Sequence, residues 1–128
     1  MKKRYYIIIA LVILTVFGYQ YLFHDKRNIN TEKPSFILNA SVLNSYFIKD
    51  NARFNEKYLD KTIQINGNIT ELDVKGKAII IDSTIFATFE KNIDFNLKIN
   101  QKVIIKARFI GYDDLLENFK FDQTTIIK

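Results

Sequence analysis

The sequence contains no cysteine and no tryptophan, and it has only one histidine, one proline and four glycines. Without cysteine the chain forms neither disulfides nor thiolate metal sites. A single histidine, His24, excludes histidine-based catalytic triads and histidine-rich metal sites within a folded domain. The four glycines are too far apart to form a phosphate-cradling loop. We therefore expect a protein that is not an enzyme and that needs no cofactor.

The positive charge of the chain is concentrated at its N-terminus. The net charge is +5, but residues 1–27 contain five Lys or Arg and one acidic residue, which accounts for +4. The other 101 residues contain 14 basic and 13 acidic side chains, a net charge of +1. A domain this close to neutrality lacks the electrostatic footprint of a general nucleic-acid binder.

Residues 5–23 contain no charged side chain, and Thr15 and Gln20 are their only clearly polar members. Nineteen helical residues span roughly 28 Å, close to the hydrocarbon thickness of a bilayer. Tyrosines lie at both ends of this stretch, where amphipathic rings favour the membrane interface. The bulky sequence "GYQYLFHDK" offers no small-residue cleavage site. These features predict a membrane helix over residues 5–23 that is retained and not cleaved as a signal peptide.

Basic residues lie on both sides of this stretch, Lys2, Lys3 and Arg4 before it and Lys26 and Arg27 after it. The short basic N-terminus is similar to the n-region of a signal peptide, which favours a cytoplasmic N-terminus and a domain outside the cytoplasm. We divide the chain into an anchor with basic flanks (1–27), a polar linker (28–38) and a folded domain (39–128).

The domain begins with a helical pattern. Asn39 is an expected N-cap for a helix over residues 40–59, bent near residues 50–51. An apolar stripe with helical spacing predicts the face that packs on the core, and it consists of Ala40, Leu43, Phe47, Phe54 and Tyr58.

From Thr62 onward the apolar residues recur with a period of two. This predicts five strands, at residues 62–74, 77–82, 84–90, 101–113 and 119–128. In the first, Gly67 stands where the alternation calls for an apolar side chain. The apolar positions up to Ile69 have odd numbers, whereas Leu72 and Val74 have even numbers. A bulge between residues 67 and 72 would let this long strand bend and pair in both halves. In the turn after this strand, we expect Gly76 to adopt a positive φ.

Five strands of this kind are most stable when the sheet closes on itself, because closure removes exposed edges. We therefore predict a mainly β fold: a five-stranded OB-type barrel preceded by one α-helix, with an N-terminal transmembrane helix.

These residues resemble the tRNA-anti-like OB-fold family. The matching segments are "ASVLNSYFIKDNARFNEKYLDKTIQINGNI" and "GYDDLLENFKFDQTTIIK", and the resemblance covers about residues 38–128. It implies an OB barrel in a bacterial protein that is membrane-anchored or secreted. Asn55, Tyr58 and Lys61 match the family pattern, whereas Phe54 replaces an alanine and Asp60 a glycine. The three matching residues form either a functional cluster or a structural one, in which Tyr58 packs under the barrel and Asn55 caps local backbone.

By analogy with the fold, a ligand would bind along the second and third strands of the barrel, between the loops that join strands one and two and strands four and five. The residues at these places are Lys75, Lys77, Thr84, Phe86, Thr88, Tyr112 and Asp113. In the last loop, Asp113, Asp114 and Glu117 lack the spacing of an EF-hand, so we expect a solvated acidic loop and no metal.

The preferred function is a membrane-anchored, non-catalytic OB-fold binding module of the bacterial cell envelope, whose ligand is a protein, a peptide or a small molecule. A nucleic-acid-binding OB domain is the alternative, but the acidic last loop would repel phosphates, so we do not expect it. A structural or assembly protein of the envelope is the second alternative, in which the barrel has no ligand groove.

Overall fold

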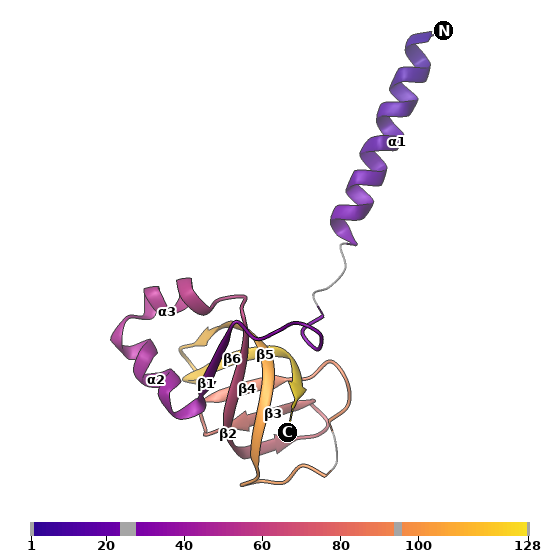
Figure 1. Ribbon diagram of the computed structural model, residues 1–128. Coiled ribbons are helices and arrows are strands. Elements are labelled where there is room, and N and C mark those ends of the chain that lie inside the picture. The colour runs from indigo at the N-terminus through magenta and orange to yellow at the C-terminus, as the bar shows by residue number, and fades with distance from the viewer. Residues whose placement is uncertain (1, 24–27, 94–95, 128) are drawn as a thin grey trace.

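The computed structural model of the chain describes residues 2–23, 28–93 and 96–127. Three residues that we named in the sequence, the single histidine His24 and the basic residues Lys26 and Arg27 after the apolar stretch, lie outside the described residues. The elements in chain order are α1 (Lys2–Leu22), β1 (Phe36–Asn39), α2 (Ala40–Lys49), α3 (Asn51–Tyr58), β2 (Thr62–Asp73), β3 (Ala78–Ile81), β4 (Ile85–Thr88), β5 (Lys102–Asp113) and β6 (Asn118–Ile126). Figure 1 shows their arrangement.

Strands β2 to β6 close into the five-stranded OB-type barrel that the sequence predicted. The first half of β2, residues 62–68, pairs antiparallel with β5, and its second half, residues 69–73, pairs antiparallel with β3. The ring is completed by β3 with β4, by β4 with β6 in parallel, and by β6 with β5. β2 thus takes part in both halves of the barrel, because its residues change partner after Asn68.

The change of partner coincides with the predicted bulge. The register of β2 against β3 shifts between Ile69 and Glu71. Because the bulge inserts one residue, Ile69 before it and Leu72 after it can both turn toward the interior. Gly67 does not have a positive φ, and its role is steric: a Cβ there would lie 2.3 Å from Cγ2 of Ile81 and 3.0 Å from Cβ of Ala40. The missing side chain makes room for these two neighbours.

The segment before the barrel contains a strand that we did not predict. β1 lies within and just after residues 28–38, which we expected to be a linker, and it pairs in parallel with the start of β2. Ile29 is buried, and the backbone carbonyl of Asn30 accepts a hydrogen bond from Nζ of Lys106 (2.9 Å). The side chain of Asn30 also accepts a hydrogen bond from the hydroxyl of Thr125. Residues 28–39 are therefore held along the barrel by contacts that sequence periodicity does not show.

The predicted helix is divided into two at Asp50, near the expected bend. Asp50 has extended backbone angles, and its carboxylate caps α3 by accepting a hydrogen bond from the backbone N–H of Arg53 (3.0 Å). Asn39 occupies the N-cap position of α2 but makes no capping hydrogen bond with its side chain. Its Oδ1 lies 3.4 Å from Nδ2 of Asn66, which ties the start of α2 to β2.

The two helices cover one end of the barrel through aromatic contacts. The ring of Phe54 lies 5.5 Å from those of Phe109 and Phe119, and the ring of Phe47 lies 5.4 Å from that of Phe119. Ala40, Leu43, Phe54 and Tyr58 from the predicted stripe are buried, as are Val103, Ile105, Ala107 and Phe109 along β5. The aromatic stripe of the helices is therefore part of the hydrophobic core.

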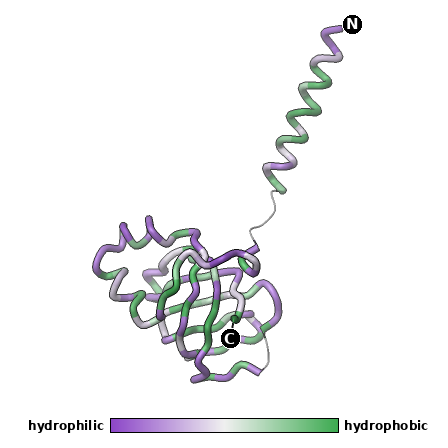
Figure 2. The backbone as a smooth tube through the Cα atoms, in the orientation of Figure 1, coloured by the Kyte–Doolittle hydropathy of each residue, from purple (hydrophilic) through white to green (hydrophobic). Residues whose placement is uncertain are grey.

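α1 is long and apolar enough to cross a membrane, and none of its residues is buried. Its 21 residues would extend over roughly 32 Å at about 1.5 Å per residue. Figure 2 shows the apolar stretch along this helix, which follows a short hydrophilic N-terminal end.

Candidate functional site

The outer surface of β4 carries two of the predicted ligand-binding residues. Ile85 and Ala87 point into the core, so the alternation places Phe86 and Thr88 on the outside, where both are half-buried. Phe86 is directly opposite Ile80 on β3 and Lys120 on β6. We name the surface around Phe86, Ile80 and Lys120 the β3–β4 face. Its centre is apolar, because Ile80 and Phe86 are adjacent there.

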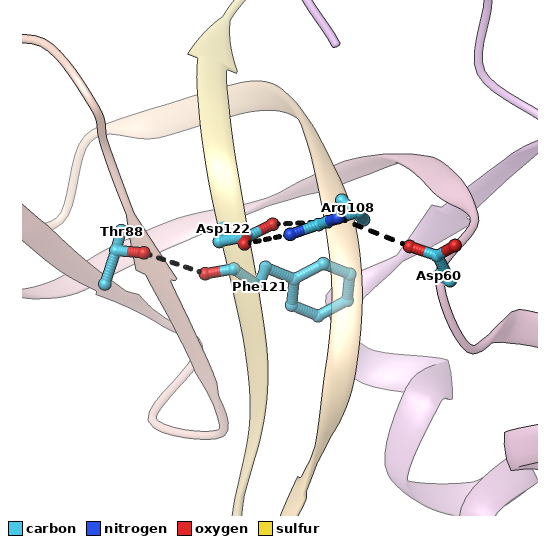
Figure 3. Close-up of polar contacts among 5 residues, drawn as sticks. All are labelled: Asp60, Thr88, Arg108, Phe121 and Asp122. Carbon is cyan, nitrogen blue, oxygen red and sulfur yellow. Dashed lines mark hydrogen bonds and ion pairs between the residues drawn. The ribbon is translucent and has the colours of Figure 1, made fainter. Parts of the chain in front are cut away.

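Thr88 stabilises this part of the barrel. Its hydroxyl donates a hydrogen bond to the backbone carbonyl of Phe121 (3.2 Å), which joins β4 to β6 where the parallel register between them ends (Figure 3). The side chain is therefore occupied by a structural contact.

Lys75 and Lys77 lie in the turn between β2 and β3, at one end of the β3–β4 face. Lys75 is exposed and Lys77 is half-buried. The expectation of a positive φ at Gly76 is wrong: Lys77 has the positive φ, of 53°. Gly76 instead donates its N–H to the carboxylate of Asp73 (2.9 Å), and a Cβ at Gly76 would lie 2.3 Å from that carboxylate. Glycine leaves room for this approach of Asp73, whose exposed side chain would have to move if a Cβ were added.

Thr84, Tyr112 and Asp113 lie at the opposite end of the face. Lys77 is opposite Phe89, five residues from Thr84, so the two ends are roughly 16 Å apart at about 3.3 Å per residue. The carbonyl of Thr84 accepts a hydrogen bond from the N–H of Phe119 (2.8 Å). The ring of Tyr112 lies 4.2 Å from that of Phe47 and 5.0 Å from that of Phe119. The fold thus brings these three residues together but separates them from Lys75 and Lys77.

A hollow of about 420 Å³ lies beside the hairpin between β5 and β6. Its lining includes Tyr112, Asp113 and Lys120, and the exposed side chain of Leu115 forms part of its rim. Asp113 accepts hydrogen bonds from the backbone N–H groups of Leu115 (2.9 Å) and Leu116 (3.1 Å). It also forms an ion pair with Nζ of Lys120 (2.9 Å). Asp113 therefore stabilises the hairpin between β5 and β6 through contacts with the turn and with β6.

These contacts shift the pKa values of two groups. The hydrogen bond from Lys120 and those from the backbone N–H groups of Leu116 and Leu115 lower the pKa of Asp113. Burial raises the pKa of Tyr112, and the nearby carboxylates, with Glu117 first among them, raise it further. Both shifts favour the usual charge state of each group at neutral pH, an ionised carboxylate for Asp113 and a neutral phenol for Tyr112.

Arg108 is paired in a similar way on the outer side of β5. Its guanidinium makes two hydrogen bonds to the carboxylate of Asp122 (2.8 and 2.5 Å), and a third contact of 3.4 Å reaches Asp60 (Figure 3). The hydrogen bond to Asp122 raises the pKa of Arg108. The cations Arg108 and Lys120 are thus both neutralised by carboxylates, and this reduces the attraction that the barrel offers to phosphate groups.

The three family-pattern residues lie in α3 and just after it. Tyr58 is buried against Phe36 and Phe54, with ring centroids at 4.8 and 4.6 Å. Oδ1 of Asn55 is buried and has no hydrogen-bond partner, so this oxygen does not cap the backbone. Lys61 is exposed, and its carbonyl accepts a hydrogen bond from the N–H of Phe109 (3.0 Å). The three residues are close in sequence, but these contacts do not direct them toward one shared site.

Asp60, which replaces a glycine of the family pattern, has a left-handed backbone with φ of 61°. Glycine adopts this conformation without steric cost, and aspartate tolerates it better than most residues. The aspartate adds a carboxylate that interacts with Arg108.

The sequence did not point to two larger hollows. One, of about 730 Å³, lies at the end of the barrel away from the helices, between residues 28–30, residues 89–93 and the end of β6. The other, of about 630 Å³, lies between β1 and the helices α2 and α3, and we name it the β1–α3 groove. In the sequence, the only signal of this groove is the short apolar run within "SFILN". The structure shows that Ile37 in this run is exposed.

Within residues 2–23, 28–93 and 96–127, no group of three or more His, Asp or Glu side chains is placed to hold a metal ion.

Comparison with known proteins gives one family match. The family model described as tRNA_anti-like matches residues 1–116. The match includes residues 1–37, which the resemblance noted in the sequence did not cover, and it ends before residues 117–128. No curated protein matches the chain. Among solved structures, the chain is similar to that of U. maydis Replication protein A bound to ssDNA, with 16% identity, 77% of each chain covered and a TM-score of 0.40.

Proposed function

The chain belongs to the tRNA_anti-like family, and on this basis we propose that it is a membrane-anchored, non-catalytic OB-fold binding module of the bacterial cell envelope. In this proposal α1 crosses the membrane with its N-terminus in the cytoplasm, and the barrel lies outside the cytoplasm. The ligand is a protein, a peptide or a small molecule.

The observation that carries the proposal is α1. A helix of 21 residues with none buried exposes an apolar surface that water does not solvate favourably, and a bilayer covers such a surface. Three basic residues, Lys2, Lys3 and Arg4, stand at its N-terminal end and support a cytoplasmic location for that end.

The contacts of the barrel support a ligand other than nucleic acid. Single-stranded nucleic acid is usually bound by free cations and by exposed aromatic rings on which bases stack. On this barrel, Lys120 and Arg108 are paired with carboxylates, and Tyr112 packs between Phe47 and Phe119. Phe86 is half-buried beside Ile80 on an apolar surface, which suits an apolar partner better than a chain of phosphates.

The membrane part of the proposal is tested by expressing the full chain with a C-terminal epitope in a bacterium. We expect the chain to stay in the membrane pellet after alkaline carbonate extraction, and we expect protease added to spheroplasts to remove the epitope. The double variant Ile9→Arg/Ile13→Arg should move the chain into the soluble fraction, because a charge at the centre of a membrane helix costs about 2.5–3.5 kcal/mol. The control Gln101→Arg, at an exposed position of the domain, should stay in the pellet. Recovery of the unchanged chain in the soluble fraction would overturn the proposal.

The ligand class is tested separately with a labelled single-stranded oligonucleotide and the full chain in detergent micelles. We expect no binding at physiological salt, and any binding at low salt should disappear steeply as salt is added. Binding that persists at physiological salt and is lost in Phe86→Ala would instead make the β3–β4 face a nucleic-acid site.

A further inference from the structure

The β1–α3 groove lies outside the barrel strands that an OB-fold site uses. β1 forms one wall, and the end of α2 and the length of α3 form the other. In Figure 1 the two helices lie on the side of β1 away from β2. We propose that this groove binds an extended acidic peptide segment of a partner protein, which adds to β1 as a further strand.

The first support is the free edge of β1. In the order of strands β1 is terminal and pairs only with β2, so among the described strands its other edge has no partner. An unpaired edge exposes backbone N–H and C=O groups that another strand can bind, and natural proteins usually protect such edges with charged residues or proline. Here the edge strand reads "FILN", and the side chain of Ile37 is 64% exposed. At about 3.3 Å per residue, the four residues of β1 can pair with a segment of similar length.

The second support is the aromatic floor of the groove. The rings of Phe36 and Tyr58 meet edge to face at 4.8 Å, and Phe54 lies behind Tyr58. Tyr46, on α2, is about half exposed and lines the same groove. Side chains that alternate along an added strand would contact these rings on every second residue.

The third support is charge. Three cations line the groove, Lys49, Arg53 and Lys57, against one carboxylate, Asp50. The carboxylate of Asp50 already accepts a hydrogen bond from the N–H of Arg53 as the N-cap of α3. The groove therefore carries a net charge of +2, although residues 28–128 as a whole carry only +1.

The position of Lys57 directs this charge over the aromatic floor. Its Nζ lies 5.4 Å from the ring centroid of Phe36 and 5.2 Å from that of Tyr58. An acidic side chain of a bound peptide would therefore pair with the ammonium group of Lys57. Other side chains of the same peptide would pack on the rings of Phe36 and Tyr58. Complementary charge of this kind selects an acidic partner over a basic one.

The strand edge favours a peptide over other anionic partners. A bilayer surface or a nucleic acid could satisfy the cations, but neither supplies backbone groups for β1. The groove shares no residue with the β3–β4 face, and peptide binding there does not depend on the membrane location of the barrel.

The test uses the full chain in detergent micelles and a fluorescent, capped peptide of alternating glutamate and valine, with binding followed by fluorescence anisotropy. The double variant Arg53→Glu/Lys57→Glu should weaken binding at least about tenfold, because two attractive charges become repulsive. The matched control Lys98→Glu/Lys102→Glu changes the net charge equally at exposed positions outside the groove, and it should change binding by less than about twofold. Circular dichroism of both variants checks that they are folded.

A second probe separates strand addition from simple charge attraction. The same peptide, N-methylated at every second residue, keeps its charge but loses backbone donors, so it should bind at least about tenfold more weakly. The proposal is overturned if the methylated peptide binds as well as the parent, or if both charge variants lose affinity equally. It is also overturned if the acidic peptide fails to bind. Binding of phosphatidylglycerol vesicles or an oligonucleotide that Arg53→Glu/Lys57→Glu abolishes would then assign the groove to that partner.

Discussion

Replacement of Gly67 by alanine tests the steric account of the bend in β2. The backbone of Gly67 lies outside the left-handed region, so alanine adopts it without backbone strain. The added Cβ, however, would lie 2.3 Å from Cγ2 of Ile81, which is about 1.2 Å inside an ordinary carbon–carbon contact. The added Cβ would also lie 3.0 Å from the Cβ of Ala40. Ile81 and Ala40 are both buried, so neither can withdraw without disturbing the core.

The magnitude follows from two opposing effects. Overpacking of a well-packed core costs about 1–3 kcal/mol, and a contact this short belongs at the upper end. The lower entropy of the unfolded chain returns about 0.4–1 kcal/mol on replacement of glycine by alanine. We expect Gly67→Ala to lower the free energy of unfolding by about 2 kcal/mol, which corresponds to a fall in Tm of about 10 °C for a domain of this size.

The assay is urea unfolding of the full chain in detergent micelles, followed by near-UV circular dichroism of the tyrosines. A double-mutant cycle with Ile81→Ala identifies the cause. Ile81→Ala alone should cost about 2–5 kcal/mol through the cavity that it leaves. Because the alanine at position 67 then fills part of that cavity, the double variant should be more stable than the sum of the single effects by at least about 1 kcal/mol. A stable Gly67→Ala, or additive effects, would refute the steric account.

Three further predictions concern the charged groups of the barrel. Asp60→Gly should be at least as stable as the unchanged chain, because the φ of 61° favours glycine. For the same reason Asp60→Ala should be less stable than Asp60→Gly by about 1 kcal/mol. Equal urea midpoints for the two variants would contradict this. Asp122→Asn should lower the free energy of unfolding by about 1–2 kcal/mol, since it weakens the two hydrogen bonds to Arg108 and both side chains are only 26% exposed. If this loss of stability vanishes in moderate salt, the ion pair behaves as an exposed one. Because the pKa of Asp113 is lowered in the folded chain, its contribution to stability is present above its unfolded pKa of about 3.9 and is lost as the pH falls through its folded pKa. Asp113→Asn should therefore remove part of the acid destabilisation, and acid unfolding curves that stay parallel would show that the contact with Lys120 has no such effect.

The closed barrel could be predicted because its strands carry a period of two, and because the apolar residues of β5 alternate without interruption. The bulge in β2 could be predicted because one inserted residue reverses the facing of every later side chain, which is visible as the change from Ile69 to Leu72. The helical stripe was equally clear, since its residues recur with helical spacing, and Ala40 and Leu43 on α2 and Phe54 on α3 are all buried in the core.

The candidate sites were harder to predict. The sequence could place Tyr112 and Asp113 in the last hairpin, but it could not show that Tyr112 packs against Phe47 or that Asp113 pairs with Lys120. These contacts depend on distances between segments that are remote along the chain. The same holds for the β1–α3 groove, whose cations come from the helices and whose strand edge lies before them.

The sequence by itself determined the number and type of the barrel strands, the long apolar helix α1 and the near-neutral charge of the domain, because each is a property of periodicity or composition. Only the tertiary structure decided the position of β1 beside β2, since four residues are too few to show a period. It also decided why position 67 is glycine. The sequence indicated a bend there. A side chain does not fit at position 67 because Ile81 and Ala40 occupy the space, and they reach it only after the barrel has closed and α2 has packed against it.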